Sequence, residues 1–214
     1  IGAFVLSLAV LFISNLGGRS NSMKLLLAGM ALSAVCSAFS SFIVYFANNK
    51  EGMQSIAYWL MGSLAGAKWN ELAVIAPVII VSVLFFWTQS RVLNLMLLGD
   101  ETAITMGTDL HRYRQWYLLI SSLIVGFAVY SAGMIGFVGL IIPHVMRMFM
   151  GPDHKKLIPA SALVGAIFLV ICDGLCRIII PHTELPIGIL ISMIGAPCFI
   201  YLMIKRTYGF GGND

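Results

Sequence analysis

Long uncharged apolar windows alternate with short polar connections along the chain, which is the pattern of a polytopic membrane protein. About 20 apolar residues are enough to cross the hydrocarbon of a bilayer in one helix. Five windows fit one crossing each, and these are residues 1–18, 25–47, 72–90, 157–180 and 185–204. We therefore expect an all-α integral membrane protein built as a helical bundle.

The window over residues 115–146 has a different length from the others. Its 32 uncharged residues are too many for one crossing at about 1.5 Å per residue and too few for two full ones. Gly133 and Gly136 lie in its middle. We expect a full helix from about 115 to 132, a tight turn, and a short helix to about 149 that is turned at Pro143. About seven membrane segments result.

Composition supports this reading, because 59% of the 214 residues are hydrophobic and only 10% are charged, well below the quarter that is usual in soluble proteins. The net charge of +4 comes from scattered basic residues, so no nucleic-acid surface is expected. The four cysteines form no CxxC pair, and we interpret them as small packing residues. No basic region precedes Ile1 and no cleavage site follows, so we expect an N-terminally truncated permease-like chain without a signal peptide.

Basic residues predict the orientation of the bundle, because they concentrate in cytoplasmic loops. Ten of the 13 lysines and arginines fall in alternate connections, and Lys50, Lys68 and Arg177 are the remaining three. We expect the first residues outside and the C-terminus in the cytoplasm. Interpreting the short helix as a loop would place its flanking charges on the wrong side.

The longest cytoplasmic connection runs over residues 99–114. Asp100 can cap a short helix that Gly107 ends, and Thr108 or Asp109 can cap a second helix that leads into the next span. Two short helices at a right-angle turn would form a rigid surface suited to docking a partner. The alternative is an interfacial connection that has no partner.

Small residues recur four apart on two of the apolar windows. They are Gly29, Ser33, Ser37 and Ser41 in the first window, and Gly188, Ser192, Gly195 and Ala196 in the second. Such spacing lets helices approach closely. It also fits the smooth, weakly polar wall of a translocation pathway, and the two interpretations can hold for different turns of one helix.

Few other side chains indicate chemistry. Asp173 and Arg177 are four apart and can pair, which lowers the cost of placing charge at membrane depth. Arg177 lies near the outer end and could instead reach the surface to meet an acidic partner. His144 shares no ligand spacing with the other histidines, so we expect a structural, hydrogen-bonded role. Residues 181–186 are expected to form a turn. No GxxxxGK[ST], GxSxG or HExxH motif is present.

Seven segments together resemble the permease subunits of iron–siderophore and vitamin B12 ABC importers, the FecCD family. They are LLLAGMAL at 25–32, WLMGS at 59–63, LGDETA at 98–103, FVGLIIPHVMR at 137–147, GPDH at 151–154, LIPASAL at 157–163 and ELPIGILISMIGAPCFIYL at 184–202.

The resemblance implies ten spans, of which this chain would hold the fourth to the tenth as one permease domain. It implies a homodimer in the cytoplasmic membrane of a bacterium or archaeon, two ATPase subunits, and an extracytoplasmic substrate-binding protein. The cargo would be a metal chelate, with a ferric siderophore first and haem or cobalamin as alternatives. No bound cofactor or metal of the permease itself is implied.

The resemblance also assigns roles to individual residues. Those of ATPase coupling are Gly99, Asp100, Glu101, Thr102, Ala103 and Gly107 within the 99–114 segment. Those of the pathway wall are Gly29, Ser33, Ser37, Gly188 and Ser192. Asn21 and Ser22 would form a cytoplasmic gate, and Arg177 would contact the binding protein.

Two functions from other classes compete with this one. An ion-coupled secondary transporter needs intramembrane carboxylates or a proton relay, and Asp173 is the single buried candidate. Its expected pairing with Arg177 argues against that role. An intramembrane enzyme would need a nucleophile with a neighbouring base, and no such pair is visible in the sequence.

Overall fold

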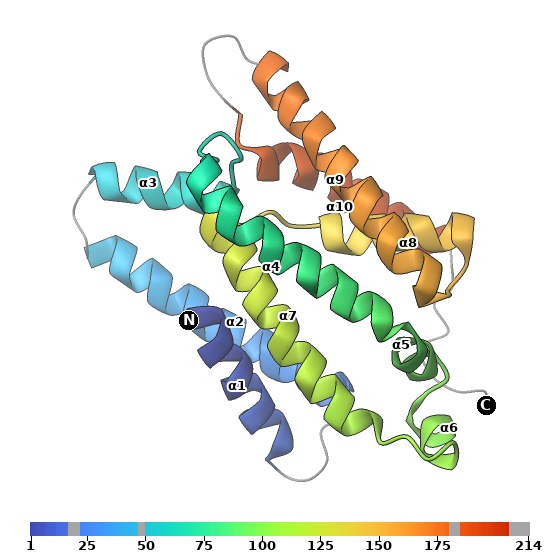
Figure 1. The fold of residues 1–214 in the computed structure, drawn as a ribbon. Helices are drawn as coiled ribbons and strands as arrows, with labels where there is room; N and C mark the ends of the chain where they lie inside the picture. Colours follow the sequence, from blue (N-terminus) through green and yellow to red (C-terminus); the bar gives the residue numbers. More distant parts are fainter. Residues whose placement is uncertain (17–21, 47–49, 180–184, 206–214) are drawn as a thin grey trace. The chain divides into compact units, whose positions relative to one another are not determined.

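The computed structural model describes residues 1–16, 22–46, 50–179 and 185–205, and these form ten helices without strands (Figure 1). The helices are α1 (Gly2–Asn15), α2 (Ser22–Phe46), α3 (Lys50–Met61), α4 (Trp69–Thr88), α5 (Ser90–Leu97), α6 (Asp100–Thr105), α7 (Leu110–Ala132), α8 (Val138–Met150), α9 (His154–Ile179) and α10 (Ile187–Lys205). The predicted all-α class is confirmed for this part of the chain.

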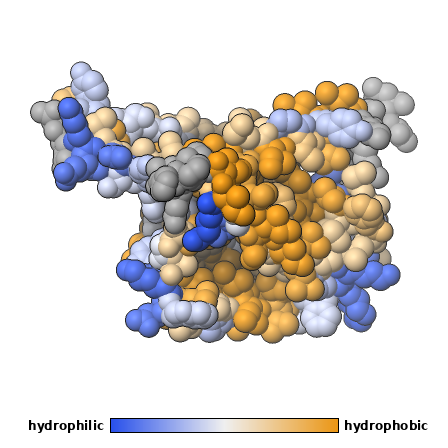
Figure 2. Space-filling model, turned by 90° about the horizontal axis from the view of Figure 1, so that it is seen from above, coloured by the Kyte–Doolittle hydropathy of each residue, from blue (hydrophilic) through white to orange (hydrophobic). Residues whose placement is uncertain are grey.

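Four of these helices, α2, α4, α7 and α9, are long and apolar enough to cross a membrane. Shorter apolar helices form at Gly2–Asn15, Val138–Met150 and Ile187–Leu202. Large apolar side chains stay exposed on the long helices, as with Phe39 at 65% and Val170 at 72%. Apolar side chains also cover much of the face turned to the viewer in Figure 2. Such surface is expected of helices that face lipid or other membrane helices.

The chain divides into two compact units. The first contains Ile1–Ala57 and Lys68–Ser131, and the second contains Tyr58–Ala67 and Ala132–Asp214. In the first unit α1 packs against α2. The Ser7 hydroxyl on α1 hydrogen-bonds the Ser122 hydroxyl on α7 at 3.0 Å, and Gly126 faces Ala3 closely.

In the second unit α8 and α9 pack against each other and both contact α10. One core cluster joins Cys172 and Cys176 to Ile187 and Ile191, which are almost fully buried. Both cysteines are free thiols and serve as small packing residues, as predicted. A second cluster joins α8 and α9 near their connection.

The predicted break between the two helices of the 115–146 window is confirmed, with α7 ending at Ala132 and α8 beginning at Val138. Gly133 and Phe137 have positive φ angles of 69° and 63°. The break is fastened to the end of α3, because the Trp59 carbonyl accepts the Met134 N–H at 3.3 Å. A side chain at Gly133 would run into that carbonyl, so only glycine fits.

Pro143 does not turn the chain, and that prediction was wrong. It lies inside α8, which continues to Met150. Proline removes one backbone hydrogen bond from a helix interior. Ile142 and Met146 are buried on either side of it and hold the helix in place through packing. Tertiary contacts therefore outweigh the local preference of this proline.

Two helices, α3 and α5, were not predicted. A search for uncharged windows long enough to cross a membrane passes over both, because α3 has 12 residues and begins with Lys50 and Glu51, and α5 has eight. Both nevertheless matter for the site, since α5 leads into the predicted docking segment.

Candidate functional site: the connector and the two small-residue helices

The connector, residues 99–109, links α5 to α7 through the short helix α6. Gly99 is the N-cap of α6, with a φ of 90° that favours glycine. The prediction that Asp100 caps this helix was therefore wrong by one residue, because Asp100 is already the first helical residue. The chain reverses at Gly99 in a backbone region that an aspartate would enter only with strain.

The end of α6 is closed by a Schellman turn. The Gly107 N–H donates to the Ile104 carbonyl and the Thr108 N–H donates to the Ala103 carbonyl, both at 2.9 Å. Gly107 has a φ of 77°, which fits its predicted role as the stop. These two bonds satisfy carbonyls that the end of a helix otherwise leaves unpaired.

Asp109 starts the next helix, as the sequence predicted for Thr108 or Asp109. Its Oδ1 accepts the His111 N–H at 3.1 Å. That helix is not a separate short one, however, since α7 runs without a break from Leu110 to Ala132. No helix breaker separates the polar start of α7 from its apolar body, so the predicted pair of short helices is reduced to α6 and the first turns of α7.

The connector has an inner and an outer side. Ala103 and Leu110 are 0% and 2% exposed, whereas Ile104 and Met106 are 59% and 61% exposed. A hollow of about 260 Å³ lies between Ile104, Gly107, Thr108 and Asp109. Exposed apolar side chains on a rigid turn outside the spans are typical of a protein docking surface.

The connector is fixed to the helices around it by a contact that sequence reasoning missed. The Tyr117 hydroxyl on α7 donates to Gln89 Oε1, between α4 and α5, at 3.0 Å. The Tyr117 ring lies 5.6 Å from the Phe86 ring at the end of α4. A glutamine directly after an apolar window was the available signal for this bond.

The small-residue stripe on α2 is open. A Cβ atom added to Gly29 would meet no atom within 4 Å, and Ser33, Ser37 and Ser41 are exposed. Ala28, by contrast, is buried. Within this chain the stripe therefore supports no close helix packing.

The small-residue stripe on α10 is closed. Gly188 is buried with its Cα against the Met61 carbonyl, where a side chain would collide with backbone. A Cβ at Gly195 would lie 2.9 Å from Phe137 Cβ and 2.8 Å from Ile141 Cδ1. Packing is thus the use of these glycines, and Gly188 does not line an open pathway as predicted. Ser192, between them, is half-buried.

Asp173 and Arg177 form the predicted pair inside α9, with Arg177 Nε 2.9 Å from Asp173 Oδ2. The arginine side chain remains half exposed at 50%. Of the predicted gate, Asn21 lies outside the described residues, as does the turn before Leu185, and Ser22 begins α2. Among the described residues, no three His, Cys, Asp or Glu side chains gather where they could hold a metal ion.

Comparison with known proteins fixes the family. The sequence profile of the FecCD transport family matches residues 1–205. The chain belongs to the FecCD transport family. The hemin transport system permease protein HmuU of Yersinia pestis is 37% identical, with 96% of this chain and 62% of the relative covered. The cobalamin import system permease protein BtuC of Halobacterium salinarum is 39% identical, with 96% and 54% covered.

The FecCD fold is also found in a solved structure described as an inward-facing conformation of a metal-chelate type ABC transporter. It is 35% identical, has a TM-score of 0.84, and is covered over 96% of this chain and 64% of its own. The chain thus spans less than two thirds of the length of each of these FecCD relatives.

Proposed function

We propose that this chain is the greater part of the membrane-spanning subunit of an ABC importer that carries a metal chelate into the cell. The FecCD match over residues 1–205 is the observation that supports this most strongly. The relatives named for hemin and cobalamin transport, and the metal-chelate type transporter, agree on a large metal chelate as cargo. The subunit would not be an enzyme, and separate ATPase subunits would hydrolyse ATP.

The proposed assembly is a permease homodimer with two ATPase subunits on the cytoplasmic side and an extracytoplasmic binding protein. The C-terminus would lie in the cytoplasm, on the same side as the connector, as the distribution of lysine and arginine favours. Asn21 and Ser22 would form the cytoplasmic gate, and the half-exposed Arg177 would meet an acidic group of the binding protein.

The connector is the proposed coupling element. Its outer side offers Ile104 and Met106 to a groove of the ATPase, and its inner side is anchored by the buried Ala103. The Tyr117–Gln89 hydrogen bond ties the start of α7 to the junction of α4 and α5. A push on the connector would therefore reach α4 and α7 together. The open face of α2, with Gly29, Ser33 and Ser37, would form part of the pathway wall.

Ferric siderophore, haem and cobalamin are the candidate cargoes. A ferric siderophore was the first expectation, and the relatives named for hemin and cobalamin favour the other two. Binding of each chelate to the partner binding protein would decide among them. The pairing of Asp173 with Arg177 disfavours the competing ion-coupled transporter, because a carboxylate held in an ion pair takes up a proton less readily.

The coupling proposal is tested in proteoliposomes that contain the full-length permease and its ATPase. Loaded binding protein should raise ATP hydrolysis, and Ile104→Asp should lower uptake about tenfold, since a charge at a buried contact costs a large part of its energy. Glu101→Lys should act in the same direction.

A matched control is Met53→Asp on α3, which is also exposed, at 43%, but lies outside the connector. It should leave uptake unchanged. Normal uptake by both Ile104→Asp and Glu101→Lys would show that the connector does not couple. Absence of any response to loaded binding protein would contradict the importer function itself.

A further inference from the structure

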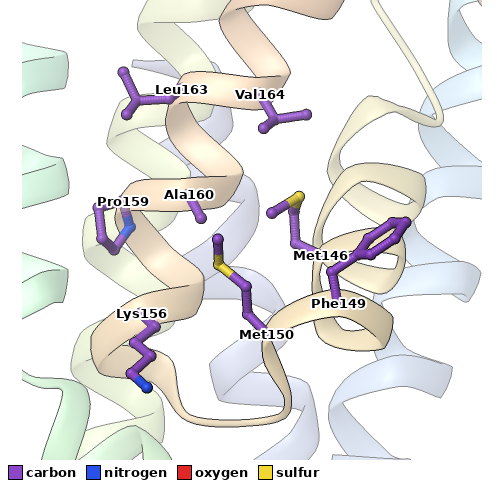
Figure 3. Close-up of a pocket in the computed structure, with 8 residues that line it drawn as sticks. All are labelled: Met146, Phe149, Met150, Lys156, Pro159, Ala160, Leu163 and Val164. Carbon is purple, nitrogen blue, oxygen red and sulfur yellow. The ribbon is translucent and has the colours of Figure 1, made fainter.

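A groove runs between α8 and α9 in the second unit and has no role in the proposed coupling or pathway (Figure 3). Its volume is about 720 Å³. It is lined by Met146, Phe149, Met150, Lys156, Pro159, Ala160, Leu163 and Val164. One of these eight side chains is charged and the other seven are apolar.

The walls of the groove follow from helix periodicity. On α8 the lining residues are three and four apart, and on α9 they recur every three to four residues from Lys156 to Val164, so each set occupies one helix face. Ala160 is small and leaves room between the helices. Phe149 and Leu163 remain 81% and 66% exposed, so apolar surface stays uncovered along the groove.

The charged end of the groove lies at the connection between α8 and α9. Figure 3 shows Lys156 at this end, below Ala160 and Met150. Arg147 in the last turn of α8 and Lys155 beside Lys156 add two exposed cationic side chains. The acidic residue here is Asp153, whose Oδ1 already accepts the Lys155 backbone N–H at 3.0 Å. The connection therefore carries a positive excess.

We propose that this groove is a binding site for an anionic phospholipid. The 26 residues of α9 exceed the thickness of the hydrocarbon at about 1.5 Å per residue, whereas the 13 residues of α8 reach only about two thirds of it. The groove therefore opens into the bilayer at one interface. An acyl chain fits its apolar walls, and Lys156 meets the phosphate at its polar end.

Charge complementarity selects an anionic lipid over a zwitterionic one. Basic pockets between membrane helices bind anionic head groups, and each lysine near such a surface strengthens binding by about 1 kcal/mol, a factor of about five. A zwitterionic head group would place its own ammonium beside Arg147, Lys155 and Lys156. Phosphatidylglycerol and cardiolipin are the test lipids of the right chemistry.

The experiment measures lipid retained by the purified full-length permease–ATPase complex after equilibration with vesicles of equal parts phosphatidylglycerol and phosphatidylcholine. Native mass spectrometry counts the bound lipids. Lys156→Gln should lower retained phosphatidylglycerol about fivefold. Lys155→Gln is the matched control, because Lys155 is adjacent but does not line the groove, and its effect should be clearly smaller.

A second variant tests the apolar part of the site. Ala160→Phe fills the groove while keeping Lys156, and it should also lower retention of phosphatidylglycerol. Thermal unfolding and size-exclusion elution show whether each variant is folded. Soluble glycerol phosphate, added in excess, should not displace the lipid, because it lacks the acyl chain that the groove holds.

Equal retention by the wild type, Lys156→Gln and Ala160→Phe would overturn the proposal and would show that another part of the protein or a second copy covers the groove. Equal effects of Lys156→Gln and Lys155→Gln would overturn it as well, because they would show diffuse attraction without a site. Neither result bears on transport, so failure here leaves the importer proposal intact.

Discussion

The helices α2 and α10 carry the same small-residue spacing and use it in opposite ways. On α2 the positions around Gly29 face open space, while on α10 Gly188 and Gly195 lie against backbone and side chains of other segments. The comparison teaches that spacing alone states only that a helix permits close approach. What lies opposite decides whether the approach occurs.

The segments that face α10 explain the difference. Gly188 meets Met61, at the end of α3, and Met134 in the break between α7 and α8. Both of these segments present backbone carbonyls toward the helix. On α2, by contrast, Ser33 and Ser37 are exposed in this chain. The first stripe fits a packed joint, and the second fits a surface reserved for cargo or for another chain.

The largest effect is expected from Gly188→Ala. The added methyl group would collide with the Met61 carbonyl, which cannot rotate away as a side chain can. We expect a loss of about 3 kcal/mol in the free energy of unfolding, at the upper end for overpacking. Thermal unfolding of the purified full-length protein measures it. Gly174→Ala on α9, where nothing lies within 4 Å, is the control. Equal stability of the two variants would show that α10 is not closely packed.

A smaller loss is expected from Gly195→Ala, because one of its two close neighbours is the flexible end of a side chain. The new methyl group would lie 2.8 Å from Ile141 Cδ1 and 2.9 Å from Phe137 Cβ. We expect a loss of about 1–2 kcal/mol. Ile141→Val should recover part of it in the double variant, which denaturation curves would reveal as non-additivity. Strict additivity would contradict this contact.

A gain is expected from Gly29→Ala on α2. Alanine is favoured over glycine in a helix by roughly 0.5–1 kcal/mol, and no atom opposes the methyl group. Thermal unfolding of the full-length permease should show a small rise. A fall instead would mean that another segment or subunit packs closely on α2, and the contrast with α10 would then disappear.

The smallest change in stability is expected from Ser37→Leu, within about 0.5 kcal/mol, because surface positions tolerate replacement. Uptake in proteoliposomes should nevertheless fall if α2 lines the pathway. Ser55→Leu, on the exposed side of α3, provides the control for a surface serine elsewhere. Normal uptake by the Ser37 variant would remove α2 from the pathway wall.

Local signals in the sequence predicted local structure well. Gly133 marked the break before α8, Gly107 ended α6, and Asp109 capped α7, because each depends on the backbone preferences of one residue and its neighbours. The contact of Gly188 with Met61 joins positions more than a hundred residues apart, and no local pattern contains it. Pro143 failed for the same reason, since the packing of α8 decided its conformation.

The Schellman turn of the connector has a practical consequence for inhibitor design. A helix of six residues cannot nucleate by itself in water, so α6 exists because Gly99, Gly107 and the buried Ala103 hold it in place. A synthetic peptide copied from residues 99–109 would be unfolded and would make a weak decoy for the ATPase. Ligands that compete at this surface would need a staple or a ring closure to supply the shape that the whole permease provides.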